Sequence, residues 1–213
     1  MTSLPTVVLP IPWHECLVDL ARLVSDETPI VGMPSGPCIL FGAHALWPFA
    51  VLPRGTIIFN SEHPSTWTPH YRAFMAEYET WSYSKNALAP GAKAFEFTPK
   101  TWPALPKVEK DIDVLHFGSM NDRRRAVLSA LQSEGLNVHH AFGVFGRDLD
   151  ALIARSKVVL NVHYYVDPPC FEAARVLPLL AKGATVVCEE TPNEGPTWAV
   201  PYEGLVDACK RAL

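Results

Sequence analysis

Polar side chains that could bind a phosphorylated ligand gather between two apolar runs near the carboxyl end of the sequence. The stretch Lys157 to Glu190 reads KVVLNVHYYVDPPCFEAARVLPLLAKGATVVCEE, and its two ends are typical of buried strands. Between them lie His163 and Tyr164, followed by Glu172 and Arg175. A carboxylate at a helix start can accept hydrogen bonds from ribose hydroxyls, and an arginine beside it can bind phosphate oxygens. A plain ion pair between Glu172 and Arg175, three residues apart on one helix face, is the alternative.

A second group of this kind lies in the segment FGSMNDRRR, at the end of an earlier apolar run. Gly118 and Ser119 permit close approach of a ligand, and Arg123, Arg124 and Arg125 open the next helix. The free N–H groups and positive partial charge of a helix N-terminus favour phosphate, to which arginines add bidentate hydrogen bonds. Three successive arginines span about 300° of a helix, so they cannot all face one ligand. A basic surface turn is the alternative interpretation.

A general base could come from the first half of the chain. The segment TIIFNSEHPSTW is an apolar run followed by polar residues that include Glu62 and His63, and His14 follows the first apolar run. A carboxylate or an imidazole at the end of a strand can take a proton from a reacting hydroxyl. Polar residues at strand ends also serve as caps and turn residues, which is the plainer interpretation of each candidate.

The sequence carries no motif for a metal or for the common nucleotide loops. Its eight histidines lack the spacing of metal ligands, and GxGxxG, GxxxxGK[ST] and GxSxG are absent. These absences count against dinucleotide-dependent oxidoreductases, P-loop NTPases and α/β-hydrolases. We therefore expect no bound metal and no cofactor.

The cysteines are odd in number and scattered, without a CxxC pair, which predicts reduced core residues. Only Cys170 is expected near a helix N-terminus, where a thiolate would be stabilised. The full set is Cys16, Cys38, Cys170, Cys188 and Cys209.

The elements that must position these groups are most regular after Asp111. Continuous apolar runs alternate with amphipathic segments, which predicts parallel strands covered by helices on both faces. The expected strands are 113–118, 137–143, 157–165 and 184–190, and the expected helices are 122–135, 146–156, 168–183 and 201–213. Since ligands of open parallel sheets bind at the carboxyl ends of the strands, the polar groups should converge on one edge.

The first hundred residues show the same alternation less regularly. The expected strands are 6–11, 56–62, 80–84 and 92–97, the expected helices are 13–26 and 68–79, and residues 32–54 resist assignment. The segment 98–111 has three prolines and alternating charge, which is typical of a semi-rigid linker. We expect an α/β protein with two small Rossmann-like domains, residues 1–100 and 111–213, and a hinge near residues 99–110.

The composition is that of an ordinary globular protein. The 213 residues are 48% hydrophobic and 19% charged, with a formal net charge of -4. This charge counts against a strongly cationic nucleic-acid binder, although Arg54, Arg72 and Lys85 could build a modest basic patch. No apolar stretch reaches the roughly 18 residues of a spanning helix, and the N-terminus has no basic leader. We expect a cytoplasmic protein without a membrane span.

Several segments together resemble a known group of enzymes. DVLHFGSMNDRRRAVLSALQSEGLNV, LIARSKVVLNVHYY, FEAARVLPLLAKGATVVCEE and PYEGLVDACKRAL are similar to the nucleotide-binding half of bacterial and phage GT-B type glycosyltransferases. IIFNSEHPS and YETWSYSKNALA resemble the end of the matching N-terminal half. The resemblance covers residues 55–213, is strongest from residue 111 onward, and depends on the ordered set of segments.

The resemblance implies two parallel sheets that face each other across a cleft, and metal-independent transfer of a sugar from a nucleotide-sugar donor to an acceptor. It implies that Glu172 holds the ribose and that Arg175 neutralises charge on the leaving nucleoside diphosphate. The base would be Glu62, His63 or His14. The donor-binding residues would be Gly118, Ser119, Arg123, Arg124, His163, Tyr164, Glu172 and Arg175.

Two features depart from the resemblance. A related glycosyltransferase family carries paired glutamates eight residues apart, whereas here Glu172 stands alone and Pro178 takes the second position, so retention or inversion stays open. The chain is also short for two complete halves.

The acceptor stays open as well. It could be a small molecule, a cell-surface glycan or protein, or a hydroxymethylated DNA base, which would require a basic groove and a pocket for a flipped base. A catalytically degenerate nucleotide-binding module of the same fold is the main alternative function. A nucleotide-sugar epimerase or dehydrogenase would require the missing glycine-rich motif.

Overall fold

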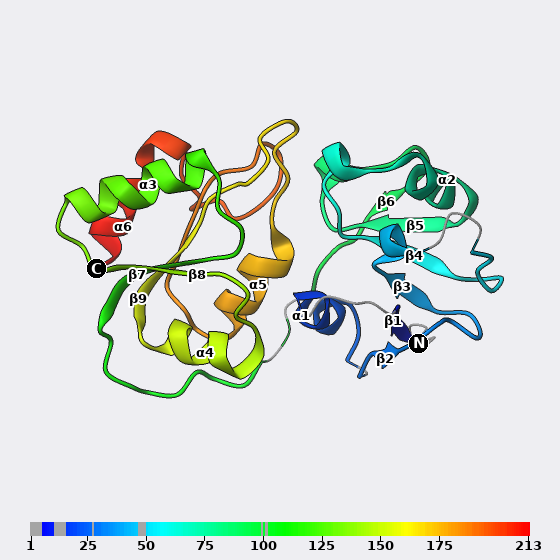
Figure 1. Cartoon of the computed structure of the whole chain (residues 1–213), viewed down its shortest axis with the longest axis horizontal. Helices are drawn as coiled ribbons and strands as arrows, with labels where there is room; N and C mark the ends of the chain where they lie inside the picture. Colours follow the sequence, from blue (N-terminus) through cyan, green and yellow to red (C-terminus); the bar gives the residue numbers. More distant parts are fainter. Residues whose placement is uncertain (1–5, 11–15, 27, 47–49, 99, 101) are drawn as a thin grey trace. The chain divides into compact units, whose positions relative to one another are not determined.

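The chain forms two compact α/β units, Met1–Thr98 (unit 1) and Pro99–Leu213 (unit 2), in the computed structural model (Figure 1). The structure describes all residues except 1–5, 11–15, 27, 47–49, 99 and 101. In each unit, every described strand pair is parallel. The expected α/β class with parallel sheets is therefore confirmed.

The sheet of unit 2 has the strand order β10-β9-β7-β8. Its strands are β7 (Ile112–Phe117), β8 (Val138–Ala141), β9 (Ser156–Asn161) and β10 (Val186–Cys188). After β7 the chain adds β8 on one side and then returns to the other side for β9 and β10. The winding direction therefore reverses between β7 and β9, and such a switch point is where open α/β sheets bind ligands.

Helices cover both faces of this sheet. They are α3 (Asp122–Ser133), α4 (Gly146–Ala154), α5 (Ala173–Ala181) and α6 (Leu205–Ala212). Residues of α3 and α6 share one core cluster with the strands, and residues of α4 and α5 share the other. In α3 the inward face consists of Val127, Leu128 and Leu131, the residues whose spacing predicts an amphipathic helix.

Helix α5 begins later than its sequence indicates. Residues 168–172 precede the helix, and Pro169 disfavours helical geometry at Pro168. Glu172 is consequently the N-cap residue of α5 and not a residue of its first turns. Pro178 lies within the helix and is buried.

Unit 1 has a six-stranded sheet in the order β2-β1-β3-β4-β5-β6. Its strands are β1 (Val7–Leu9), β2 (Ile30–Val31), β3 (Ile39–Phe41), β4 (Ile57–Asn60), β5 (Glu79–Ser82) and β6 (Lys93–Ala94). The winding reverses between β1 and β3, so this unit has its own switch point. Strand β3 lies within residues 32–54, which the sequence leaves unassigned, and its three residues are fully buried.

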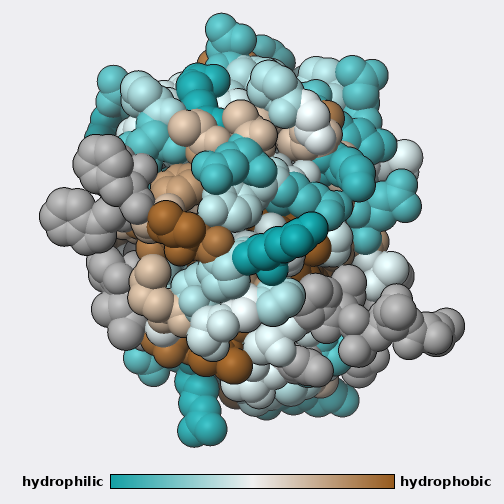
Figure 2. Space-filling model, turned by 90° about the vertical axis from the view of Figure 1, so that its right-hand side faces the viewer, coloured by the Kyte–Doolittle hydropathy of each residue, from teal (hydrophilic) through white to brown (hydrophobic). Residues whose placement is uncertain are grey.

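The helices of unit 1 are α1 (Cys16–Val24) and α2 (Pro69–Glu77). Thr68 caps α2 by accepting a hydrogen bond from the N–H of Tyr71 at 3.4 Å, and Pro69 occupies the first helical position. On the face shown in Figure 2, apolar surface occurs in separate groups among hydrophilic residues. Among the helices of the described residues, none has the length and apolar character needed to cross a membrane.

Candidate ligand-binding site

The switch point of unit 2 is built around a glycine. Gly118 follows β7 with a φ of +100°, a conformation that other residues rarely adopt. A Cβ atom at this position would lie 2.7 Å from Nη2 of Arg175. The backbone of residue 118 and the guanidinium of Arg175 can therefore approach each other only because residue 118 has no side chain.

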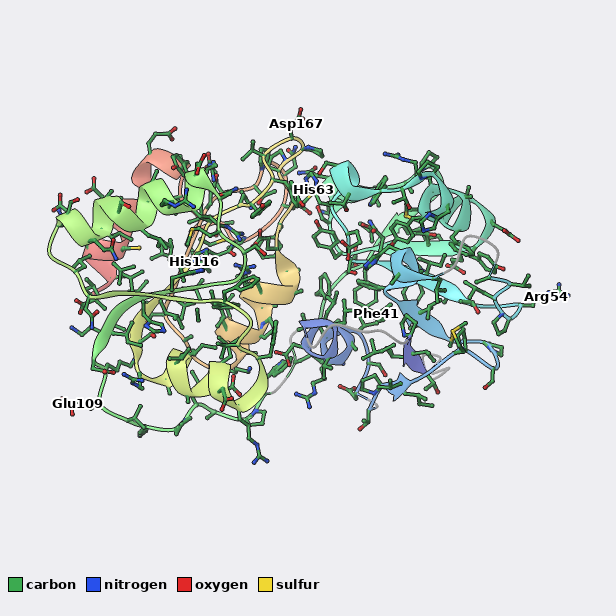
Figure 3. All side chains as sticks on the ribbon, in the orientation of Figure 1. Phe41, Arg54, His63, Glu109, His116 and Asp167 are labelled. Atoms are coloured by element: carbon green, nitrogen blue, oxygen red, sulfur yellow. The ribbon has the colours of Figure 1, made fainter. Side chains whose placement is uncertain are left out.

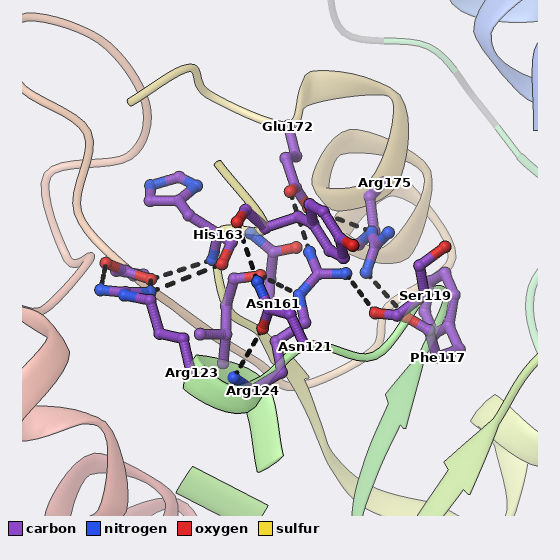
Figure 4. Close-up of polar contacts among 12 residues, drawn as sticks. Phe117, Ser119, Asn121, Arg123, Arg124, Asn161, His163, Glu172 and Arg175 are labelled. Atoms are coloured by element: carbon purple, nitrogen blue, oxygen red, sulfur yellow. Dashed lines mark hydrogen bonds and ion pairs between the residues drawn. The ribbon is translucent and has the colours of Figure 1, made fainter. Parts of the chain in front are cut away.

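Arg175 extends from α5 to the end of β7, where the figure shows it beside Phe117 (Figure 4). Its Nη1 donates a hydrogen bond to the carbonyl oxygen of Phe117 at 2.7 Å, and its guanidinium lies 5.0 Å from the Phe117 ring centroid. Its Nε lies 3.2 Å from Oε2 of Glu172. The side chain is 20% exposed, so its charge remains accessible to solvent at the carboxyl edge of the sheet.

Arg124 is buried, with a side chain only 1% exposed. Its Nε donates to the carbonyl oxygen of Val162 at 2.8 Å, its Nη1 donates to that of Ser119 at 2.8 Å, and its Nη2 donates to Oε1 of Glu172 at 3.0 Å. Burial lowers the pKa of Arg124 to about 10, and the neighbouring Glu172 carboxylate opposes that shift. These hydrogen bonds tie the ends of β7 and β9 together and direct Nη2 at Glu172, and the expected ligand contact of Arg124 stays a prediction.

Glu172 lies between these two arginines. Its Oε1 accepts the hydrogen bond from Arg124, and its Oε2 is at ion-pair distance from Arg175. Its side chain makes no capping hydrogen bond to α5, although it occupies the N-cap position. The ion pair with Arg175 that the sequence indicates is present, and Arg124 makes it part of a three-residue network (Figure 4).

Arg123 has partners that the sequence does not reveal. It forms an ion pair with Glu189 at the end of β10, and its guanidinium lies 3.8 Å from the ring centroid of Tyr202. The Tyr202 hydroxyl donates a hydrogen bond to the carbonyl oxygen of Arg123 at 2.9 Å. The only signal for Glu189 in the sequence is a carboxylate directly after the apolar run VVC. Arg123 and Arg124, although adjacent, are thus held by different carboxylates.

His163 is buried directly beyond β9. Its backbone N–H donates to Glu189 at 2.9 Å, and its Nε2 lies 3.1 Å from the carbonyl oxygen of Glu190 and 3.0 Å from the Thr191 hydroxyl. Since a carbonyl oxygen only accepts, Nε2 carries the proton in the neutral ring. The Nδ1 atom is then an acceptor, and it has no hydrogen-bond partner among the described residues.

Four further polar atoms are buried without a hydrogen-bond partner in the described part of unit 2: Nε1 of Trp102, Nε2 of His116 on β7, Oδ1 of Asn161 at the end of β9, and Oε2 of Glu172. His116 lies in the interior of the unit (Figure 3), and its Nδ1 is 3.1 Å from Nδ1 of His140. Burial, followed by the positive charges of Arg175 and Arg124, lowers the pKa of His116 to about 2. Buried polar atoms without partners are uncommon and mark places where water or a ligand can complete the hydrogen bonding.

The remaining expected donor-site residues lie at the same edge. Ser119 is exposed, and its carbonyl oxygen accepts from Arg124. Tyr164 is half-buried, and its ring centroid lies 5.2 Å from the Arg124 guanidinium. The side-chain amide of Asn121 donates a hydrogen bond to the carbonyl oxygen of Tyr164 at 2.9 Å. The structure therefore brings the donor-site residues of the sequence analysis together around β7 and β9, with different individual partners.

In unit 1, the three candidate bases have different outcomes. His63 is buried and caps a short 3-10 helix, with its Nδ1 2.8 Å from the Ser65 hydroxyl. Glu62 is 30% exposed, and its Oε1 lies 3.3 Å from Nδ1 of His44. His14 lies outside the described residues. The structure thus gives His63 the plainer capping role and leaves Glu62 as the accessible carboxylate.

His44 is the residue of unit 1 that sequence reasoning missed. It follows β3 within the unassigned segment, next to the switch point, and its side chain is 38% exposed. The ring lies edge-on to Tyr71 at a centroid distance of 5.9 Å, and the Tyr71 hydroxyl donates to Oδ1 of Asn60 at 3.0 Å. Nδ1 of His44 is at ion-pair distance from Glu62 but makes no hydrogen bond within the described residues, so a small movement of either side chain would be needed for Glu62 to hold the ring in one tautomer.

The cysteines and metals give no further site. Cys38, Cys170, Cys188 and Cys209 are buried, and burial raises the pKa of Cys188 and Cys209 to about 12. Cys170 precedes α5, and its thiol is 3.6 Å from the carbonyl oxygen of Pro168. Within the residues that the structure describes, no group of three or more His, Cys, Asp and Glu side chains is arranged to hold a metal ion.

No protein-family model matches this chain. The chain is similar to three uncharacterized proteins of Acanthamoeba polyphaga mimivirus. It is 27% identical to L137 over 134 residues (62% of this chain and 17% of L137), 40% identical to L138 over 67 residues (31% and 8%), and 33% identical to L140 over 70 residues (32% and 23%). The matched part is less than a quarter of each relative's length. These similarities assign no family, and the function must be argued from the site.

Proposed function

We propose that this chain is a compact glycosyltransferase of the GT-B type, with a nucleotide-sugar donor bound by unit 2 and the acceptor activated by unit 1. The observation that carries the proposal is the cluster of Gly118, Glu172, Arg175 and His163 at the switch point between β7 and β9. The parallel sheets of the two α/β units support the proposal.

The chemistry of this edge suits a diphosphate. In the loop after β7, Ser119 is exposed, and the partly exposed guanidinium of Arg175 lies directly against Gly118. An arginine can donate two parallel hydrogen bonds to phosphate oxygens, and the same charge stabilises a leaving nucleoside diphosphate as the bond to the sugar breaks. The unpartnered Nδ1 of His163 supplies an acceptor for a hydroxyl of the ligand.

The base that we propose is His44, with Glu62 as the carboxylate that holds its ring. With Nδ1 protonated towards Glu62, Nε2 would carry the lone pair that accepts a proton from the acceptor hydroxyl. His63 is replaced in this role because its Nδ1 is engaged in a turn. No metal or cofactor enters the proposed reaction.

The acceptor is proposed only by class. It would carry a hydroxyl, as in a hydroxymethylated DNA base or a cell-surface glycan. Arg54, one of the residues of the expected basic patch, lies on an outer loop of unit 1 (Figure 3). A transfer assay with both acceptor classes would distinguish them.

The proposal is tested by ligand-dependent stability and by turnover. Wild type and Arg175→Gln are heated with UDP-, GDP-, ADP-, CMP- and dTDP-sugars, with Arg155→Gln as the matched control, because Arg155 pairs with Asp111 on an exposed surface of the same unit. A donor at about 100 times its Kd should add roughly 2.7 kcal/mol to wild type and to the control, and much less to Arg175→Gln. Release of the sugar is then followed by mass spectrometry. No response to any nucleotide-sugar would refute the proposal.

A nucleotide-binding module without turnover is the second candidate. One observation favours it: each of the three arginines of the site already contacts Glu172 or Glu189, so these ion pairs form without a ligand. Stabilisation by one nucleotide-sugar with neither hydrolysis nor transfer, across the acceptor classes above, would support the module over the enzyme.

A further inference from the structure

We infer that the carboxylate of Glu172 is an internal anion that occupies a phosphate position between Arg124 and Arg175, and that a phosphate or diphosphate group binds there by displacing it. The inference deepens the proposed function and rests on it for the identity of the complete ligand. It differs from the role that the resemblance implies, in which Glu172 holds a ribose from the start.

The geometry around Glu172 is that of a bound oxyanion. Its Oε1 is 3.0 Å from Nη2 of Arg124, and its Oε2 is 3.2 Å from Nε of Arg175. The two oxygens thus face two different guanidinium groups at the N-terminus of α5, whose positive end favours negative charge. The Glu172 side chain makes no capping hydrogen bond to the backbone N–H groups of α5.

The two arginines would stay in place if the carboxylate moved away. Arg124 keeps its hydrogen bonds to the carbonyl oxygens of Val162 and Ser119, and Arg175 keeps its hydrogen bond to that of Phe117. Each guanidinium would then present an unpaired N–H group at the vacated position. Two cations around one position match a phosphate dianion better than they match a single carboxylate.

The side chains at this position are partly open to solvent, although Oε2 of Glu172 is itself buried. Glu172 and Arg175 are both about one-fifth exposed, at 22% and 20%, whereas Arg124 is covered. Glu172 is the N-cap residue, so its side chain can turn away without any change in α5. Once displaced, the carboxylate lies beside the ligand and is available to accept hydrogen bonds from its hydroxyls.

A second observation in the same unit concerns His116. Nε2 of His116 is buried without a hydrogen-bond partner among the described residues, and the ring lies within the electrostatic influence of both arginines. A neutral imidazole nitrogen beside two cations can donate to a phosphate oxygen or accept from a bound water. Gly118, which has no side chain, lets the guanidinium of Arg175 lie against the turn after β7.

The test compares inorganic pyrophosphate binding by wild type and Glu172→Gln, measured by calorimetry at constant ionic strength. Removal of the competing internal charge should tighten binding at least about tenfold, since close charge pairs in proteins couple by more than the 1.4 kcal/mol that corresponds to a factor of ten. The double variant Glu172→Gln/Arg175→Gln should lose this gain. Asp111→Asn, which frees the exposed Arg155 in the same unit, is the matched control and should bind like wild type.

The buried charge of Arg124 makes a second measurement necessary, because Glu172→Gln could unfold. Pyrophosphate should then raise the midpoint of thermal unfolding more in Glu172→Gln than in wild type. Glu172→Asp, which keeps the charge but shortens the reach, should give an intermediate affinity. If the Gln variant is unfolded even with pyrophosphate while Glu172→Asp binds no more tightly than wild type, the inference is wrong.

The outcomes separate this inference from the proposed function. Tighter pyrophosphate binding by Glu172→Gln, with no nucleotide-sugar binding by either protein, would support the displaced anion and refute the glycosyltransferase. Nucleotide-sugar binding by wild type, with pyrophosphate affinity equal or weaker in Glu172→Gln, would overturn the displaced anion and leave the glycosyltransferase standing. Pyrophosphate binding by neither protein would also overturn it.

Discussion

The guanidinium of Arg175 lies against the backbone of Gly118, with Nη2 2.7 Å from the place where a Cβ of residue 118 would stand. This contact joins the start of α5 to the turn after β7, and the hydrogen bond from Arg175 to the Phe117 carbonyl oxygen holds it. Two features of this turn therefore require a glycine: the positive φ of the backbone and the closeness of the Arg175 guanidinium. The two features can be separated by mutation.

Gly118→Ala should lose more stability than Gly143→Ala. Both glycines have a positive φ, +100° and +70°, so alanine introduces backbone strain on the order of 1–3 kcal/mol at either site. Only at residue 118 does the new methyl group also meet a guanidinium, because a Cβ at residue 143 has nothing within 4 Å. Urea denaturation measures both losses. Equal losses would show that Arg175 moves aside without cost.

Arg124 should be among the most sensitive residues of unit 2. Arg124→Met removes three hydrogen bonds and leaves Glu172 with one cation, which should cost up to about 3–5 kcal/mol in the free energy of unfolding. Arg125→Ala, one residue later on the exposed face, should change it by no more than about 0.5 kcal/mol. The double variant Arg124→Met/Glu172→Leu should lose less than the sum of its single changes. Additive losses would contradict the network.

Much of unit 2 could be predicted from its sequence because its strands are continuous apolar runs and its helices have an amphipathic period. The runs at 113–118 and 157–165 overlap β7 and β9, each of which begins one residue earlier, although β9 ends at Asn161. In unit 1, β3 could not be predicted in this way. Its three residues lie among prolines and glycines, and a segment this short shows no periodicity.

The site could be predicted as a location but not as a set of contacts. Since the carboxyl ends of parallel strands share one edge, the convergence of Gly118, His163 and Glu172 follows from topology. The partners of Arg123 and Arg124 do not, because successive helical residues point about 100° apart and their carboxylates come from distant segments. His44 was missed for a related reason, since it belongs to the unassigned segment around β3.

The buried His116 predicts loss of stability in acid. Burial lowers its folded-state pKa to about 2, against an ordinary value of 6.5, so between these values the unfolded chain takes up a proton that the folded chain does not. Stability due to the neutral ring is therefore complete above pH 6.5 and falls as the pH decreases, by at most about 1.4 kcal/mol per pH unit. Urea titrations from pH 7 to pH 4 measure this slope.

The matched variants isolate the contribution of that ring. His116→Asn should reduce the pH dependence of stability, since it removes the titrating group while keeping a polar atom near His140. His139→Asn, at an exposed position of β8, should leave the slope as in wild type. If both variants keep the wild-type slope, another group is responsible for the acid sensitivity.

The pair of His44 and Glu62 gives the most direct test of unit 1. His44→Asn should lower turnover of the donor with its acceptor by about 10²–10⁴-fold, the usual contribution of a general base, while donor affinity stays unchanged. Glu62→Gln should lower turnover less than His44→Asn. In wild type, the nitrogen NMR signals of the neutral His44 ring should show a proton on Nδ1 and not on Nε2. Glu62→Gln should remove this preference. Glu79→Gln, which breaks the exposed ion pair with Lys93 in the same unit, should affect neither measurement. If His44→Asn keeps full turnover while His63→Asn loses it without loss of stability, the base is His63, and the exposed pair has a structural role only.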